Sequence, residues 1–202
     1  MSDYDPATCA ERLGKLTASK AGVIMGGLET SGLATYVKRL AWERFYGVPA
    51  EDIAKTAAMD RGNELEAAAL DWYEFETDSE LLRTPGFMAH PVIECVGASP
   101  DAVVYFDQGP IRTAQCKCPL SAAWMEVKRT LKVPAEYRWQ CKWEAWVVGV
   151  PAFDFFVWHP VAGGIIVAGE VTTEECEQMA ERAAVVDGLV QKWVEILTER
   201  AA

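Results

Sequence analysis

Residues 99–119 read SPDAVVYFDQGPIRTAQCKCP, and this stretch decides the fold. Two runs rich in strand-forming side chains, AVVYF and IRTAQCK, flank an Asp-Gln-Gly-Pro segment that has the chemistry of a turn. The stretch therefore predicts a β-hairpin. With the turn centred near Gln108, Asp101 lies opposite Gln115 to within about one residue.

One face of this hairpin gathers an acid, an amide and an ammonium group. Residues two apart on a strand share a face, so Gln115 and Lys117 point the same way, and Asp101 lies across from them. A solvated sheet face is the plainer interpretation of such a set. The apolar neighbours Val103 and Cys116 favour a strand that enters the core, and therefore a functional role for the charged groups.

Helix and strand signals on both sides of the hairpin predict an α+β fold with a small central sheet. Helices are expected at residues 31–46 and 54–75 and from residues 121, 134 and 172 onward. Further strands are expected at residues 87–96, 153–158 and 164–171. Gly62 lies inside the second helix, where glycine is less favourable than alanine by ~1 kcal/mol, so we expect close backbone packing there.

The chain of 202 residues predicts a single domain that spans positions 1–202, with a core large enough to need no disulfide or structural metal. Half of the residues are hydrophobic and 24% are charged, which excludes a disordered chain. The 19 Lys and Arg against 30 Asp and Glu give a net charge of -11, which argues against a general nucleic-acid coat. An enzyme with one basic groove, or with a carboxylate site for cations, is compatible with this charge.

Sequence patterns also bear on location and on structural metals. No apolar run approaches ~18 residues, and the N-terminus lacks a basic region followed by an apolar stretch, so we expect a cytoplasmic protein without a membrane span. The six cysteines contain no CxxC pair, which argues against structural zinc and favours free thiols. His90 and His159 are the only histidines, and we interpret both as structural.

Short motifs along the chain carry a resemblance to a known family. Pro100-Asp101 followed by Gln115-x-Lys117 resembles the Pro-Asp…acid-x-Lys pattern of the PD-(D/E)xK phosphodiesterase superfamily. Four further motifs resemble, in order, those of the phage lambda exonuclease and YqaJ-like viral recombinase family: Arg12-Leu13-Gly14-x-x-Thr17-Ala18-Ser19, Gly62-x-x-x-Glu66, Lys117-Cys118-Pro119 and Tyr137-x-x-Gln140. The resemblance covers the chain from about Arg12 to Trp158.

The resemblance implies a restriction-endonuclease-like core, a small mixed sheet flanked by helices, and a metal-dependent 5′→3′ exonuclease of double-stranded DNA. Such an enzyme releases mononucleotides and leaves 3′ overhangs for recombination by strand annealing. The resemblance also implies two Mg²⁺ ions, or Mn²⁺, held by Asp101, Glu66, residue Gln115 and the carbonyl of Cys116. Lys117 would orient the attacking water, assist its deprotonation and stabilise the developing charge.

The resemblance further implies a pocket for the 5′-terminal phosphate, made by Arg12, Ser19 and Ser99, with Tyr137 and Gln140 as additional site candidates. The implied partners are double-stranded DNA with 5′-phosphorylated ends, two further copies of the chain in a ring-shaped homotrimer, and a single-strand annealing protein. The implied setting is the cytoplasm of a bacterial host, with the gene carried by a phage or prophage.

The chain departs from the family pattern at Gln115, where the family has glutamate. Glutamine keeps the shape and one carbonyl oxygen but loses the negative charge that a hard dication prefers. We therefore expect weaker metal binding and impaired hydrolysis, whether the change was engineered or arose by natural divergence. The alternatives are a catalytically inactive DNA-end-binding protein and a structure-specific endonuclease on the same fold, whereas an iron–sulfur nuclease lacks the four-cysteine pattern it needs.

Overall fold

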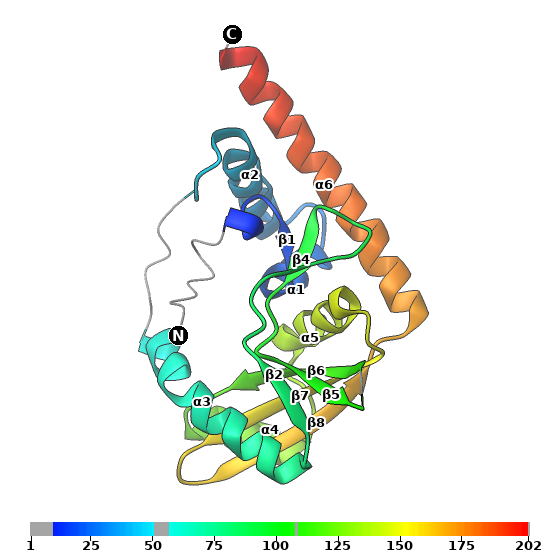
Figure 1. The fold of residues 1–202 in the computed structure, drawn as a ribbon. Coiled ribbons are helices and arrows are strands. Elements are labelled where there is room, and N and C mark those ends of the chain that lie inside the picture. Colours follow the sequence, from blue (N-terminus) through cyan, green and yellow to red (C-terminus); the bar gives the residue numbers. More distant parts are fainter. Residues whose placement is uncertain (1–9, 51–56, 108, 202) are drawn as a thin grey trace.

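The computed structural model describes all residues except 1–9, 51–56, 108 and 202. The predicted turn centre Gln108, the thiol of Cys9 and the first residues of the helix expected from residue 54 lie outside the described part. Within that part the chain forms an α+β fold with a mixed sheet between helices, as the sequence predicts (Figure 1).

The main sheet has five strands in the order β2-β5-β6-β7-β8. They are β2 (Glu80–Arg83), β5 (Ala102–Phe106), β6 (Gly109–Lys117), β7 (Ala152–His159) and β8 (Gly163–Glu170). β6 and β7 run parallel, and the other neighbouring pairs run antiparallel. The predicted hairpin is β5–β6, in the middle of the sheet. β2 is a strand that the sequence pattern did not indicate.

A smaller sheet leads into this hairpin. Its strands, in the order β1-β4-β3, are β1 (Leu16–Thr17), β4 (Val96–Ala98) and β3 (Met88–Ala89). The strand expected over residues 87–96 is therefore divided into two short strands, and Pro91 lies between them. β4 is followed directly by Ser99-Pro100-Asp101, so the small sheet positions the start of the hairpin.

Helices cover both faces of the main sheet (Figure 1). They are α1 (Ala21–Ile24), α2 (Ser31–Tyr46), α3 (Ala57–Thr77), α4 (Ser121–Thr130), α5 (Ala135–Val148) and α6 (Thr173–Ala201), with 3-10 turns η1 (Ala10–Arg12) and η2 (Ala18–Lys20). On one face Ala69 and Tyr73 of α3 pack against apolar residues of β5, β6 and β7. On the other face Cys141 and Ala145 of α5 pack against β7, beside α4. Strand residues alternate between the faces, so Gln115 points toward α5.

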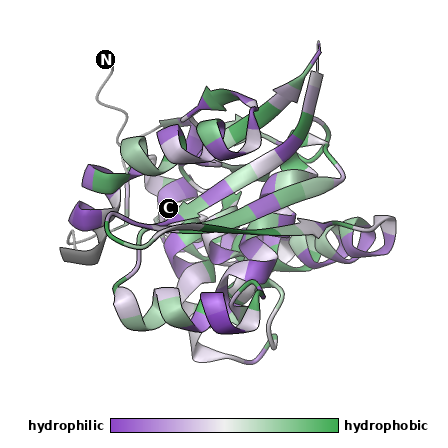
Figure 2. Ribbon diagram, turned by 90° about the horizontal axis from the view of Figure 1, so that it is seen from below, coloured by the Kyte–Doolittle hydropathy of each residue, from purple (hydrophilic) through white to green (hydrophobic). Residues whose placement is uncertain are grey.

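A third apolar core joins the N-terminal elements to the C-terminal helix. Leu40 of α2, Trp143 of α5 and Met179 of α6 are fully buried in it. In Figure 2 hydrophobic residues recur along the central strands, interrupted by hydrophilic ones, and the surrounding helices also carry both kinds of residue. In the described part of the chain the five cysteines are free, as predicted, and no helix is long and apolar enough to cross a membrane.

Candidate active site

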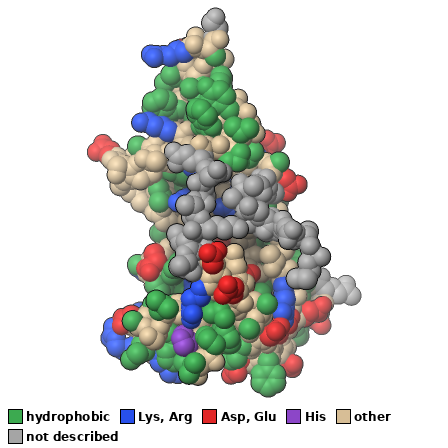
Figure 3. Space-filling view, turned by 90° about the vertical axis from the view of Figure 1, so that its left-hand side faces the viewer, with side chains coloured by type: hydrophobic (Ala, Val, Ile, Leu, Met, Phe, Trp, Pro, Cys, Tyr) green, Lys and Arg blue, Asp and Glu red, His purple; other side chains and the backbone are tan. Residues whose placement is uncertain are grey.

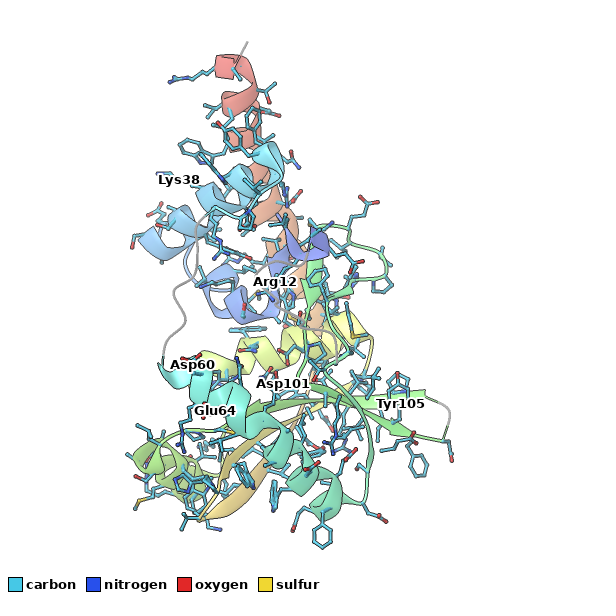
Figure 4. The ribbon with its side chains drawn as sticks, turned by 60° about the vertical axis from the view of Figure 1, so that its left-hand side comes forward. Arg12, Lys38, Asp60, Glu64, Asp101 and Tyr105 are labelled. Carbon is cyan, nitrogen blue, oxygen red and sulfur yellow. The ribbon has the colours of Figure 1, made fainter. Side chains whose placement is uncertain are left out.

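The start of β5 and the end of β6 bring Asp101 and Gln115 together, as the sequence predicts. Ala102 pairs with Ala114, which puts Asp101 opposite Gln115 one position further along. Oδ2 of Asp101 accepts a hydrogen bond from the backbone N–H of Cys116, at 2.7 Å, and another from the side-chain amide of Gln115. Asp101 is thus held by two donors at the place where the hairpin meets the rest of the chain (Figure 4).

Helix α5 adds two further polar side chains to this face of the sheet. Nε2 of Gln140 donates to Oε1 of Gln115, at 2.9 Å, and to Oε1 of Glu144, at 3.0 Å. Gln140 and Glu144 are four residues apart and therefore lie on the same face of the helix. A continuous chain of hydrogen bonds consequently runs from Asp101 through the two glutamines to Glu144.

Glu144 is an acid that the sequence analysis did not assign to the site. Its side chain is 0% exposed, and its Oε2 has no hydrogen-bond partner among the described residues. Burial, reinforced by the negative charge of Asp101, raises the pKa of Glu144 to about 8. The signal that could have found it is its position four residues after Gln140, on the helix face that the motif turns toward the sheet.

Lys117 ends strand β6, and its ammonium lies 5.4 Å from the centre of the Tyr137 ring. Burial disfavours the ammonium, but the negative charges of Asp101 and Glu144 outweigh burial and raise the pKa of Lys117. Lys117 is therefore positively charged at neutral pH. Tyr137 stacks on Phe155 at a centroid distance of 5.4 Å, so α5 and β7 together form the wall beside this ammonium.

Glu66 joins the cluster from α3, on the other side of the sheet. Burial, and then the negative charge of Asp101, raise the pKa of Glu66 to about 7, while Lys117 acts in the opposite direction. Glu66 therefore lies close enough to Asp101 and Lys117 for their charges to act on it. Asp60 and Glu64 of the same helix are exposed and lie nearer its N-terminal end (Figure 4).

Gly62 does not have the role that the sequence suggested. A Cβ atom at this position would meet no atom of the described residues within 4 Å, so close backbone packing within that part of the chain does not account for the glycine. The neighbouring Arg61 donates from Nε to the carbonyl of Cys118, at 3.3 Å. This turn of α3 is therefore tied to the end of the hairpin by Arg61, not by close approach at Gly62.

The residues predicted to bind a 5′-phosphate come from two adjoining segments. The guanidinium of Arg12 donates to Oγ of Ser19, at 3.2 Å. β1 and β4 pair in parallel, so the segments that follow them, which contain Ser19 and Ser99, leave the small sheet side by side. Ser99 is two residues before Asp101. In Figure 4 Arg12 lies above Asp101 on the same side of the molecule.

A separate hollow of about 400 Å³ lies beside the phosphate residues, between η2, α1 and α2. Lys20 and Arg39 line it together with Ser31, Thr35 and Tyr36. No residue of the β5–β6 hairpin lines this hollow. The hollow therefore adds basic side chains near Ser19 but none beside Asp101, Gln115 and Lys117. Figure 3 shows the molecule from the left-hand side of Figure 1, with acidic and basic side chains adjacent to each other below its middle.

The hairpin cluster offers oxygen donors of the kind that Mg²⁺ and Mn²⁺ prefer. They are the carboxylates of Asp101, Glu66 and Glu144, the side-chain oxygen of Gln115 and the backbone carbonyl of Cys116. Among the described residues, no group of three or more Asp, Glu, His or Cys side chains stands ready to hold a metal ion. The Gln115 amide nitrogen faces Asp101 and its oxygen faces α5, so this amide must rotate before its oxygen can meet a cation beside Asp101. The donors fit a hard cation in type, and binding would rearrange them.

Solved exonuclease structures have the same fold as this chain. The chain superposes on a crystal structure of an alkaline exonuclease (LHK-Exo) from Laribacter hongkongensis with a TM-score of 0.84 and 26% sequence identity, over 95% of each chain. The structure of LHK-Exo in complex with dAMP gives a TM-score of 0.85 at 26% identity, again over 95% of each chain. A phage related exonuclease from Haemophilus somnus 129PT shares the fold, with a TM-score of 0.67 and 15% identity over 93% of this chain and 96% of that chain.

A family profile gives the complementary sequence result. No curated protein matches the chain. Residues 9–151 match the profile of the YqaJ-like viral recombinase domain, which is more than half of the chain. The match includes every motif from Arg12 to Gln140 on which the resemblance was based. The chain belongs to the family of YqaJ-like viral recombinase domains.

Proposed function

We propose that this chain is a metal-dependent 5′→3′ exonuclease that degrades one strand of double-stranded DNA from a 5′-phosphorylated end. It would release mononucleotides and leave a 3′ overhang for recombination by strand annealing. The observation that carries the proposal is that β4 connects two sets of side chains: Asp101, Gln115 and Lys117 at the hairpin, and Arg12 with Ser19 beside β1. The similarity to LHK-Exo, an alkaline exonuclease with a structure in complex with dAMP, supports a nucleotide as the product.

The spacing of the two sets supports removal of one nucleotide at a time. Ser99 and Asp101 are two residues apart, which is at most ~7 Å of extended chain. A terminal phosphate held by Arg12, Ser19 and Ser99 would therefore leave the next phosphate of the strand beside Asp101. The phosphate that is bound and the phosphate that is cleaved would then be neighbours.

The roles of the hairpin residues follow from their charges. Asp101, Glu66, Gln115 and the carbonyl of Cys116 would hold the metal, and a pair of divalent cations, when bound, stabilises the attacking and leaving oxygens of phosphodiester cleavage. Lys117 is an ammonium held next to this group. Its charge orients the attacking water and stabilises the negative charge that develops on the phosphate.

Tyr137 and Gln140 act as positioning residues in this proposal. The Tyr137 ring lies beside the ammonium of Lys117 and is itself fixed by stacking on Phe155. Gln140 fixes the side-chain oxygen of Gln115. Both come from one face of α5, so this helix sets the orientation of the residues at the end of β6.

With Gln115 in place of the glutamate of the family pattern, the site carries one negative charge fewer. We therefore expect this chain to cleave DNA more slowly than its Gln115→Glu variant. One contact favours a second candidate function, a DNA-end-binding protein without nuclease activity. The Gln115 amide donates to the same Asp101 oxygen that a cation would need. If that hydrogen bond outlasts metal binding, the chain would hold ends without cutting them.

The proposed partners follow from the charge of the chain. A net charge of -11 opposes DNA binding by the surface as a whole. A ring-shaped homotrimer with a basic inner surface would restrict DNA to the favourable face. We propose that this ring acts on duplex ends in the bacterial cytoplasm and passes the 3′ overhang to a single-strand annealing protein.

The deciding experiment incubates this chain and its Gln115→Glu variant with linear, 5′-phosphorylated duplex DNA and Mg²⁺. Release of mononucleotides, with supercoiled circular DNA left intact, supports the exonuclease. Binding of ends by both proteins with no release by either supports the end-binding protein, and cleavage of circular DNA supports an endonuclease. The Lys117→Met variant controls for contaminating nuclease.

A further inference from the structure

Glu144 is a buried carboxylate with one oxygen that binds nothing in the described part of the chain. The side chain is 0% exposed, and Gln140 satisfies only Oε1, at 3.0 Å. Oε2 is left without a partner. A buried carboxylate is unfavourable unless it is hydrogen-bonded, paired with a cation or bound to a metal. The free oxygen therefore points to a ligand that completes this group.

The surroundings of Glu144 are those of the hairpin site. The side-chain amide of Gln140 donates hydrogen bonds to both Glu144 and Gln115. Glu144 is therefore separated from Gln115, the residue that departs from the family pattern, by one side chain. The charges of Asp101 and Lys117 both act on Glu144. Glu144 therefore belongs to the same group of charged side chains as the hairpin, although it comes from α5.

The number of carboxylates around Asp101 indicates which class of ligand would bind there. The family carries an acid at position 115, and this chain has the neutral Gln115, which leaves Asp101 and Glu66 as the acids of the motifs. Glu144 brings the number of carboxylates back to three. Hard divalent cations bind to oxygen ligands, carboxylates foremost, and their affinity rises with the charge of the ligand set.

We infer that Glu144 supplies the carboxylate that position 115 lacks, and that it shares a bound divalent cation with Asp101. The inference rests on the proposed metal-dependent nuclease function. The raised pKa keeps Glu144 mostly protonated at neutral pH until a cation binds. On giving up its proton to a cation, Glu144 would supply from α5 the negative charge that Gln115 does not supply from β6. Gln140 Nε2 holds the side-chain oxygens of both residues within hydrogen-bond distance of itself, so Glu144 and Gln115 are neighbours on this face of the sheet.

A Glu144→Gln substitution removes the negative charge of the side chain but keeps its shape, and so distinguishes a metal-binding role from a structural one. Glutamine has the same length and can still accept the hydrogen bond from Gln140, so a purely structural role would survive the change. The probe is Mn²⁺, titrated by calorimetry into the metal-free protein. We expect the substitution to weaken Mn²⁺ binding by at least about tenfold, and Gln115→Glu in the same chain to restore it. Glu136→Gln, at an exposed acid of the same helix, is the matched control and should leave Mn²⁺ affinity unchanged.

Folding is checked in the same set of proteins. The Tm of each metal-free variant shows whether it is folded, and the rise in Tm on adding Mn²⁺ gives a second measure of binding. Restored binding in the double variant shows that Glu144→Gln has not damaged the fold. Equal Mn²⁺ affinity before and after Glu144→Gln, or Mn²⁺ binding only by proteins that carry Gln115→Glu, overturns the inference.

Cleavage of 5′-phosphorylated duplex DNA by the same proteins tests the underlying function separately. If Mn²⁺ affinities follow the expected order but Gln115→Glu releases no nucleotides, the role of Glu144 stands and the nuclease proposal fails. If Gln115→Glu cleaves DNA while Glu144→Gln leaves Mn²⁺ affinity unchanged, the nuclease stands and the role of Glu144 is lost.

Discussion

The two halves of the proposed site are built in opposite ways. In the hairpin half, Gln115 is buried in β6 of the five-stranded sheet under α5, and Asp101, the residue directly before β5, accepts two hydrogen bonds. In the phosphate half, Arg12 and Ser19 lie on 3-10 turns of three residues each, and the adjoining strand β1 has two residues. Groups that stabilise a developing charge must be fixed before the reaction, whereas a long guanidinium can reach out to a phosphate. The comparison predicts that the two halves can be disabled independently.

Lys117→Met has the largest expected effect and acts on the hairpin half alone. It removes the half-buried ammonium but keeps an unbranched side chain of similar length. We expect the single-turnover rate of cleavage to fall by about 10³-fold. Binding of 5′-phosphorylated ends over 5′-hydroxyl ends, measured with Ca²⁺ in place of Mg²⁺, should not change. A loss of that preference would show that the two halves depend on each other.

Arg12→Ala is the counterpart in the phosphate half. It removes the guanidinium that donates to Ser19 and would grip the terminal phosphate. We expect cleavage from 5′-phosphorylated ends to slow by about 10- to 100-fold, as for loss of a charged hydrogen bond, with no change on 5′-hydroxyl ends. Mn²⁺ affinity should stay at the value for the unmodified chain. A preference for phosphorylated ends that survives the change would remove Arg12 from the pocket.

The same contrast explains how much could be predicted from sequence. The hairpin register follows from two strands and a turn that are contiguous in the chain, so Asp101 opposite Gln115 could be predicted locally. The small sheet could not, because β1, β3 and β4 have two or three residues each, too few for periodicity to show. β2 was missed for a related reason, since Glu80–Arg83 is recognisable as a strand only through its pairing with β5.

Glu144 shows a different limit of sequence analysis. Its place on the same helix face as Gln140 is readable from the spacing of four residues. Its burial is not, because that depends on which face of α5 meets the sheet and on how closely the two layers pack. The sequence analysis therefore assigned Glu144 no role in the site, although its side chain is 0% exposed.

Gly97→Ala tests whether the small sheet supports the phosphate half. A Cβ at Gly97 would lie 2.1 Å from Cζ of Phe87 and 2.9 Å from the carbonyl of Met88, so the sheet must shift. We expect a loss of about 1–3 kcal/mol in the free energy of unfolding, together with a weaker preference for 5′-phosphorylated ends. Gly62→Ala is the matched control, since it meets open space within a helix and should stabilise the protein by about 0.5–1 kcal/mol. An unchanged end preference in Gly97→Ala would mean that β4 does not position Ser99.

His90 gives the smallest expected effect, and it acts on the same small sheet. Its Nδ1 accepts the backbone N–H groups of Val92, at 3.2 Å, and Ile93, at 3.1 Å, and its ring packs on Trp146 at a centroid distance of 4.5 Å. Burial lowers the pKa of His90 below 6.5. The unfolded chain therefore binds the proton more readily than the folded one, so the stability that neutral His90 provides is present above pH 6.5 and is lost as the pH falls below it.

His90→Asn makes this effect measurable, because asparagine can accept the same two N–H groups without titrating. We expect the Tm of the unmodified chain to fall relative to that of His90→Asn between pH 7.5 and about 5. Parallel Tm curves would show that protonation of His90 does not loosen the turn before β4. The second ionisation of the 5′-phosphate itself lies at about pH 6 and weakens the preference for phosphorylated ends in both proteins. The preference should weaken further in the unmodified chain than in His90→Asn, because Ser99 follows β4 directly and depends on its position. Asp101 in the hairpin half is also held by two hydrogen bonds from β6, so Mn²⁺ affinity should differ less than end preference between the two proteins at any one pH.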